Sequence, residues 1–98
     1  MTYTPTARTI MLATKLGVTV RSSTTKGKKL DVFKDGIKLC SIGAIGYADY
    51  PTYLLKEQRD LVPKGTAKLR QKAYKNRHQS DRLEKGSAGW YADQLLWS

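Results

Sequence analysis

The spacing of apolar residues predicts an N-terminal helix followed by a strand. Between residues 5 and 16, apolar side chains recur at helical intervals, with Thr4-Pro5 as a helix start and Gly17 as a stop. Residues 18–22 are then rich in β-branched side chains, which favour extended structure. The chain is therefore expected to begin with a helix that leads directly into a sheet.

A hairpin is predicted next. Asp35-Gly36 separates two strand-like runs, residues 30–33 and 37–42, and Asp-Gly between such runs is a strong hairpin signal. With residues 18–22 these runs predict a small antiparallel sheet of about three strands. The polar, basic segment of residues 22–29 is expected to be a mobile loop.

The second half of the chain predicts helices. A short helix is expected over residues 52–59, a basic helix capped by Thr66 and running to about Leu83, and an aromatic helix over residues 88–97. The order of helix, sheet and helices predicts an α+β fold, and the length suits a single small domain spanning residues 1–98.

Positive charge is concentrated in two segments. The net charge is +10, and residues 1–30 hold six bases with no acid, while residues 64–85 hold eight bases with two acids. Like charges one helical turn apart repel, so such crowding does not help the chain to fold. A polyanion would neutralise it, and nucleic acid is the commonest polyanionic partner.

The candidate nucleic-acid-binding residues come from both basic segments. Along the predicted helix, some cations share one face with Arg82 and the others lie on the opposite side, while Leu69, Ala73 and Leu83 mark the core side. The alternative is a solvated face that makes no specific contact. The candidates are Lys68, Arg70, Lys72, Lys75 and Arg77 of the helix and Lys26, Lys28 and Lys29 of the loop.

The aromatic residues have several interpretations. Tyr74 is a candidate for stacking on a base, with His78 on a phosphate; in the alternative, which is favoured for His78, the tyrosine packs and the histidine bonds to Asp81. Tyrosines at every third position from residue 47 to residue 53 favour packing onto the core, and the alternative is a stacking platform.

Trp90 and Trp97 lie seven residues apart, hence on one side of the last helix, with Tyr91, Leu95 and Leu96 on the other. A helix that is apolar all round is either buried or used for association. The tryptophans are thus candidates for a protein interface, with a second copy of the chain or another protein as the partner.

Enzymatic chemistry is not expected. His78 and Cys40 are the only histidine and cysteine, which excludes the usual zinc clusters, and no catalytic residue, metal site or cofactor is predicted. The remaining alternative is a metal nuclease built from Asp49, Glu57 and Asp60. Neither a signal peptide nor a membrane-spanning run is recognisable, so we expect an intracellular or packaged protein without a membrane partner.

Three motifs stand out along the chain: GAIGYADY from Gly43, RxxxYxxRH from Arg70 and GSAGWYADxLLW from Gly86. In their order and spacing they resemble a family of small basic proteins of bacteriophages and large DNA viruses. The resemblance covers about residues 22–97, and Leu69-Arg70 stands where many members have two adjacent bases. The resemblance implies a viral origin and brings no catalytic assignment.

The sequence therefore predicts a non-enzymatic viral protein that binds DNA or RNA through phosphate contacts. The alternative is a minor virion protein, or an inhibitor of a host protein, acting through the aromatic C-terminal helix. Either function would place the protein in the host cytoplasm or in the virion.

Overall fold

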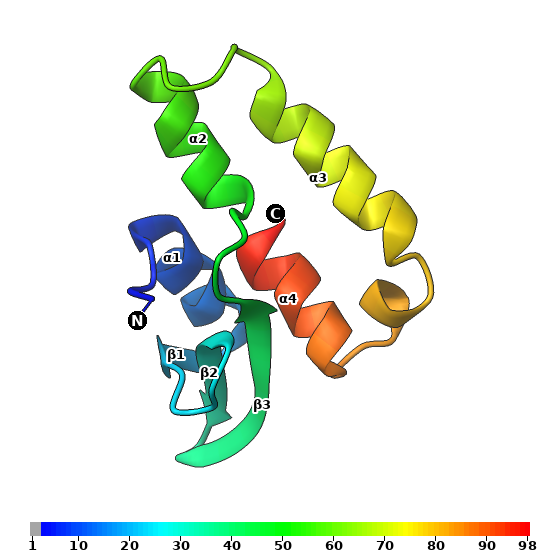
Figure 1. Ribbon diagram of the computed structural model, residues 1–98. Coiled ribbons are helices and arrows are strands. Elements are labelled where there is room, and N and C mark those ends of the chain that lie inside the picture. The colour runs from blue at the N-terminus through cyan, green and yellow to red at the C-terminus, as the bar shows by residue number, and fades with distance from the viewer. Residues whose placement is uncertain (1–2) are drawn as a thin grey trace.

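The protein combines helices with a three-stranded antiparallel sheet, as a computed structural model that describes residues 3–98 shows (Figure 1). The α+β fold predicted from the sequence is confirmed. In chain order the elements are α1 (Ala7–Leu16), β1 (Thr19–Ser22), β2 (Lys28–Lys34), β3 (Ile37–Ala44), α2 (Tyr50–Gln58), α3 (Thr66–Arg77), the short 3₁₀ helix η1 (Asp81–Leu83) and α4 (Ala88–Leu96).

The sheet is a meander in which β2 pairs with both neighbours. Asp35 and Gly36 form the β2–β3 turn, and both have positive φ angles of 51° and 78°, as a tight type I′ hairpin requires. The predicted hairpin is thus confirmed. The β2–β3 register shifts between Val32 and Phe33, a bulge that bends this pair.

The hydrophobic core lies between the sheet, α1 and α4. Leu30 and Val32 of β2 and Leu95 of α4 are completely inaccessible to solvent. The hydroxyl of Thr9 in α1 donates a hydrogen bond of 2.8 Å to the Leu95 carbonyl, so α1 and α4 are tied by a polar contact as well. Gly43 allows β3 to approach α4, since a Cβ there would lie 2.9 Å from Leu96 Cδ1.

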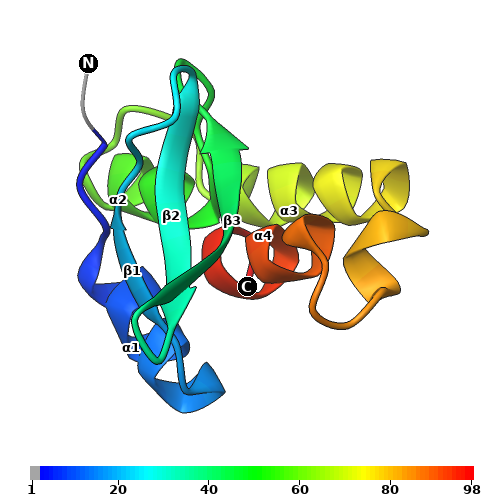
Figure 2. The same ribbon diagram turned by 90° about the horizontal axis from the view of Figure 1, so that it is seen from below.

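Helix α3 stands away from this core. It packs against α2, and in both ribbon views α4 lies between α3 and β3 (Figures 1 and 2). The helix ends at Arg77 rather than near Leu83, because the chain turns at His78 into η1. The basic segment is therefore a helix followed by a turn, and Arg82 lies outside the helix.

The start of α3 is capped by a residue of α2. Gly65 occupies the N-cap position and has no side chain, while Thr66 bonds to the Pro63 carbonyl instead of capping the helix as predicted. The Glu57 carboxylate accepts hydrogen bonds from the N–H groups of Gly65 (3.0 Å) and Ala67 (2.7 Å). These two bonds hold the pKa of Glu57 below its ordinary value.

Within residues 3–98, no helix combines the length and the apolar character that crossing a bilayer requires.

Candidate nucleic-acid interface

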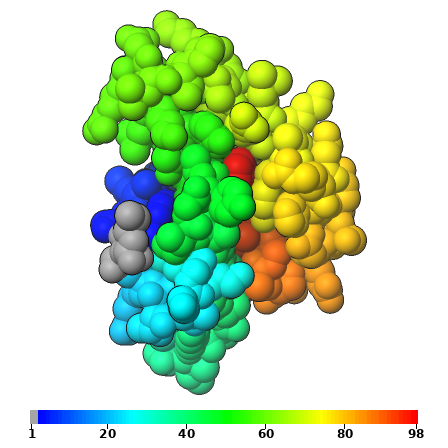
Figure 3. Space-filling view, in the orientation of Figure 1, coloured from blue at the N-terminus to red at the C-terminus, as the bar shows by residue number. Residues whose placement is uncertain are grey.

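A hollow of about 500 Å³ opens between α3, α4 and the segment that joins β3 to α2. We call it the central groove. In the space-filling view it lies between the green surface around the start of α2 and the yellow surface of α3, with the red C-terminal end of the chain at its floor (Figure 3). Charged and aromatic side chains of its lining include Lys28, Tyr47, Tyr53, Arg70, Arg77 and His78, together with the acid Asp81.

The central groove brings the two basic segments together. Lys28 reaches it from β2, while Arg70 and Arg77, seven residues apart and so on one side of the helix, line it from α3. All three side chains are exposed, and within the described part of the chain no carboxylate lies within 4.0 Å of their charged groups. Three unneutralised cations from opposite walls thus face one hollow.

The other candidate cations of α3 lie elsewhere. Lys68 and Lys72 are exposed and do not line the groove. Lys75 approaches the buried Asp93 of α4 at 3.4 Å, although the geometry leaves Asp93 Oδ1 without a true hydrogen bond. Lys75 therefore ties α3 to α4 and is a poor candidate for binding phosphate.

The inward side of α3 differs from the prediction. Leu69 is 71% exposed and Leu83 is 64% exposed, so these residues do not mark a core side. Ala67 is buried instead and Tyr74 is half-buried. The apolar residues of α3 were misleading because the helix is amphipathic only weakly and packs through an alanine and an aromatic ring.

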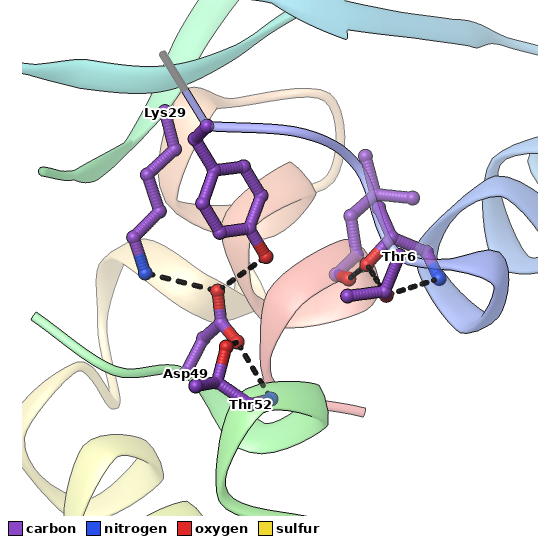
Figure 4. A network of polar contacts seen from close by, with 7 residues as sticks. Thr6, Lys29, Asp49 and Thr52 are labelled. Atoms are coloured by element: carbon purple, nitrogen blue, oxygen red, sulfur yellow. Dashed lines mark hydrogen bonds and ion pairs between the residues drawn. The ribbon is translucent and has the colours of Figure 1, made fainter. Parts of the chain in front are cut away.

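The prediction that Lys29 belongs to a mobile arm is wrong. Lys29 is only 4% exposed, and its Nζ lies 2.9 Å from Oδ2 of Asp49, an oxygen that also accepts a 2.8 Å hydrogen bond from the Tyr3 hydroxyl (Figure 4). The other oxygen of Asp49 accepts from the Thr52 N–H at 3.0 Å and caps α2. Burial and the charge of Asp49 raise the pKa of Tyr3.

The rest of the basic loop is anchored at its base. Ser23 and Thr24 donate hydrogen bonds to the buried Asp31, and Lys28 already belongs to β2. Lys26 is exposed in the turn and does not line the central groove. Of the three lysines predicted in this segment, only Lys28 is both exposed and part of the lining of the groove.

Tyr74 is not available as a stacking platform for a base. Its ring stacks on His78 at a centroid distance of 4.3 Å and on Trp97 at 4.5 Å. Two rings this close cannot share one face of a phenol, so both faces of Tyr74 are covered. Burial and the charges of Asp81 and Asp93 raise its pKa to about 12.

His78 bonds to Asp81, as favoured from the sequence. Its Nδ1 lies 3.1 Å from Oδ2 of Asp81, and this hydrogen bond lowers the pKa of the carboxyl. Among the described residues, no hydroxyl or thiol is hydrogen-bonded to the imidazole. The pair lies at the groove without a neighbouring nucleophile.

Trp90 of α4 and Trp97, which directly follows this helix, both pack within the fold. Trp90 meets Tyr91 edge-on at 5.0 Å, and Trp97 lies almost parallel to Tyr74, with 6° between the ring planes. Both are half-buried against the core. Their side of α4 is thus occupied in part by contacts inside this chain.

Trp97→Ala is expected to lower the free energy of unfolding by about 1–2 kcal/mol, because it removes half-buried area and one ring of the aromatic stack. Trp97→Phe keeps a ring and should recover most of the loss. Chemical denaturation followed by circular dichroism measures both variants. If Trp97→Ala is as stable as the wild type, the indole does not stabilise the fold, and the protein-interface interpretation of Trp97 is favoured instead.

The three carboxylates considered for a nuclease have separate structural roles. Asp49 pairs with Lys29, Glu57 caps α3, and Asp60 is exposed after α2. In the region from residue 3 to residue 98, no three His, Cys, Asp or Glu side chains are grouped as metal ligands would be. Cys40 is half-buried on β3, and burial together with the charge of Asp31 raises its pKa.

Two tyrosines for which the sequence favoured packing over a stacking platform line the groove. Tyr50 is buried and fits the predicted packing of the tyrosine segment, but Tyr47 is 75% exposed and Tyr53 is half-buried under the Arg70 guanidinium, 5.8 Å from the ring centre. The regular three-residue spacing of these tyrosines gives no sign that they differ in exposure to solvent. Only the fold shows that the segment turns its first ring towards solvent.

No family model, no curated protein and no solved structure matches this chain.

Proposed function

We propose that this chain is a non-enzymatic viral protein that binds nucleic acid through phosphate contacts in the central groove. The observation that carries the proposal is the convergence of Lys28 with Arg70 and Arg77 on one hollow, with no carboxylate within 4.0 Å of their charged groups. Asp81, the acid that lines the same hollow, is bonded to His78. The viral origin rests on the motif resemblance.

The charge balance around the groove supports this function. Of the 18 lysines and arginines, only Lys29, Lys38 and Lys75 lie within 4.0 Å of a side-chain carboxylate in the described chain. Unpaired cations on a concave surface raise the local concentration of polyanions and gain free energy from counterion release when they meet phosphates. Arginine adds bidentate hydrogen bonding to phosphate oxygens.

Removing the three unpaired cations of the central groove should weaken its binding of nucleic acid. In the triple variant Lys28→Gln, Arg70→Gln and Arg77→Gln, we expect affinity for a labelled oligonucleotide to fall at least about tenfold at low salt. The slope of log K against log salt should become shallower by about 2–3 units, because up to three phosphate contacts are lost. Fluorescence anisotropy across a salt series measures both quantities.

The matched control removes the same charge elsewhere. Lys15, Lys34 and Lys64 are exposed and do not line the central groove, so changing all three to Gln lowers the net charge equally. This control should lose much less affinity than the groove variant. Equal losses would show that binding depends on overall charge alone, and no binding by the wild type at low salt would refute the proposed function.

A further inference from the structure

We infer that the bound nucleic acid is a single strand, and that Tyr47 stacks on one of its bases between two phosphate-binding hollows. This inference rests on the proposed function and adds the class of nucleic acid and the path of the strand. Its basis is the placement of one exposed aromatic ring among cations.

A second hollow of about 270 Å³ lies beside the central groove. Tyr47 and Ala48 line both hollows, so the segment between β3 and α2 forms a ridge that separates them. The ring of Tyr47 is 75% exposed. Among residues 3–98, no aromatic ring stacks on it and no cation lies over it.

Cations flank this ridge on both sides. Arg70, Arg77 and Lys28 line the central groove, while Lys56 lines the second hollow. Lys29 borders both hollows, but its charge is neutralised by Asp49. A chain that crosses the ridge can therefore place phosphates near unpaired cations before and after the nucleotide above Tyr47.

This arrangement suits an unpaired strand better than a duplex. Proteins that bind single strands combine a basic groove with aromatic side chains on which bases stack, whereas the bases of a duplex are stacked on each other and inaccessible to such a ring. The volume of the central groove, about 500 Å³, lies within the range of pockets that enclose small ligands. One or two nucleotides fit such a space, and a rigid double helix does not enter it.

The test compares Tyr47→Ala with Tyr47→Phe on three probes: oligothymidylate, oligouridylate and a blunt DNA hairpin. Tyr47→Ala should weaken binding of both single strands about 5- to 30-fold, the lower part of the range for loss of one base–aromatic stack. Tyr47→Phe keeps the ring and should bind like the wild type. The hairpin should bind more weakly than either strand and respond less than about twofold to Tyr47→Ala.

Leu61→Ala is the matched control, because Leu61 is also strongly exposed, at 67%, and lines neither hollow. Hairpin binding as tight as single-strand binding overturns the inference. It is also overturned if Tyr47→Ala binds strands like the wild type while the Lys28, Arg70 and Arg77 triple variant does not, a result that leaves the proposed function standing. No binding to any of the three probes refutes both.

Discussion

Asp49→Asn is expected to lower the free energy of unfolding by about 3–5 kcal/mol, because it leaves the buried ammonium of Lys29 without a counter-charge. Asparagine can still accept the hydrogen bond from the Thr52 N–H, so the cap of α2 is kept. The variant therefore isolates the charge of residue 49 from its capping role. Guanidinium denaturation followed by tryptophan fluorescence measures the loss.

The double variant Lys29→Met and Asp49→Asn tests whether the single variant loses stability through the unpaired charge of Lys29 or through poorer packing. Replacing both members of a buried ion pair by groups of similar volume is often nearly neutral, so the double variant should recover most of the stability lost by Asp49→Asn. If the single variant is unfolded outright, the double variant should still fold. A double variant as unstable as the single one would show that the ion pair is not what matters there.

The local parts of the fold were predictable from the sequence. The β2–β3 hairpin depends on Asp35-Gly36, whose conformational preferences act within the turn itself. The same holds for the N-terminal helix, although its cap is Thr6 rather than Thr4. The cap of α3 was not predictable, because Glu57 reaches it across a loop from another helix.

The candidate site was predictable in charge but not in geometry. Lys28 and Lys29 are neighbours in sequence, yet Lys28 lies exposed at the start of β2, whereas Lys29 is buried on the opposite face of the strand and pairs with Asp49. Without the strand bounds and the pairing of β2, the sequence gives no reason to expect different surroundings for these two lysines. Tyr74 was likewise a reasonable stacking candidate until its position beside Trp97, a contact between distant residues, showed both ring faces covered.

Acid should weaken the sheet through Asp31, a carboxylate at the centre of β2 that is only 2% exposed. Its oxygens accept hydrogen bonds from the hydroxyls of Ser23 (2.5 Å) and Ser41 (2.6 Å), and Lys38 lies 3.4 Å away. Burial by itself would raise the pKa of Asp31. These hydrogen bonds, one from the Thr24 N–H and the charge of Lys38 outweigh burial and hold the pKa well below its ordinary value.

A carboxyl whose pKa is lower in the folded than in the unfolded state stabilises the fold when it is ionised. The contribution of Asp31 is therefore complete above about pH 5, and it is lost as the pH falls below the unfolded value of about 3.9 towards the folded-state pKa. Asp31→Asn should lower the free energy of unfolding by about 2–3 kcal/mol at neutral pH, since the hydrogen bonds to a charged acceptor are lost. The difference from wild type should shrink as the pH falls.

Urea denaturation from neutral pH down to about pH 3 measures this dependence. Asp35→Asn is the matched control, because Asp35 is exposed in the turn of the same hairpin and asparagine tolerates its positive φ angle. That variant should stay within about 0.5 kcal/mol of wild type across the range. If the difference in free energy of unfolding between Asp31→Asn and wild type stays constant with pH, Asp31 acts through its shape and not through its charge.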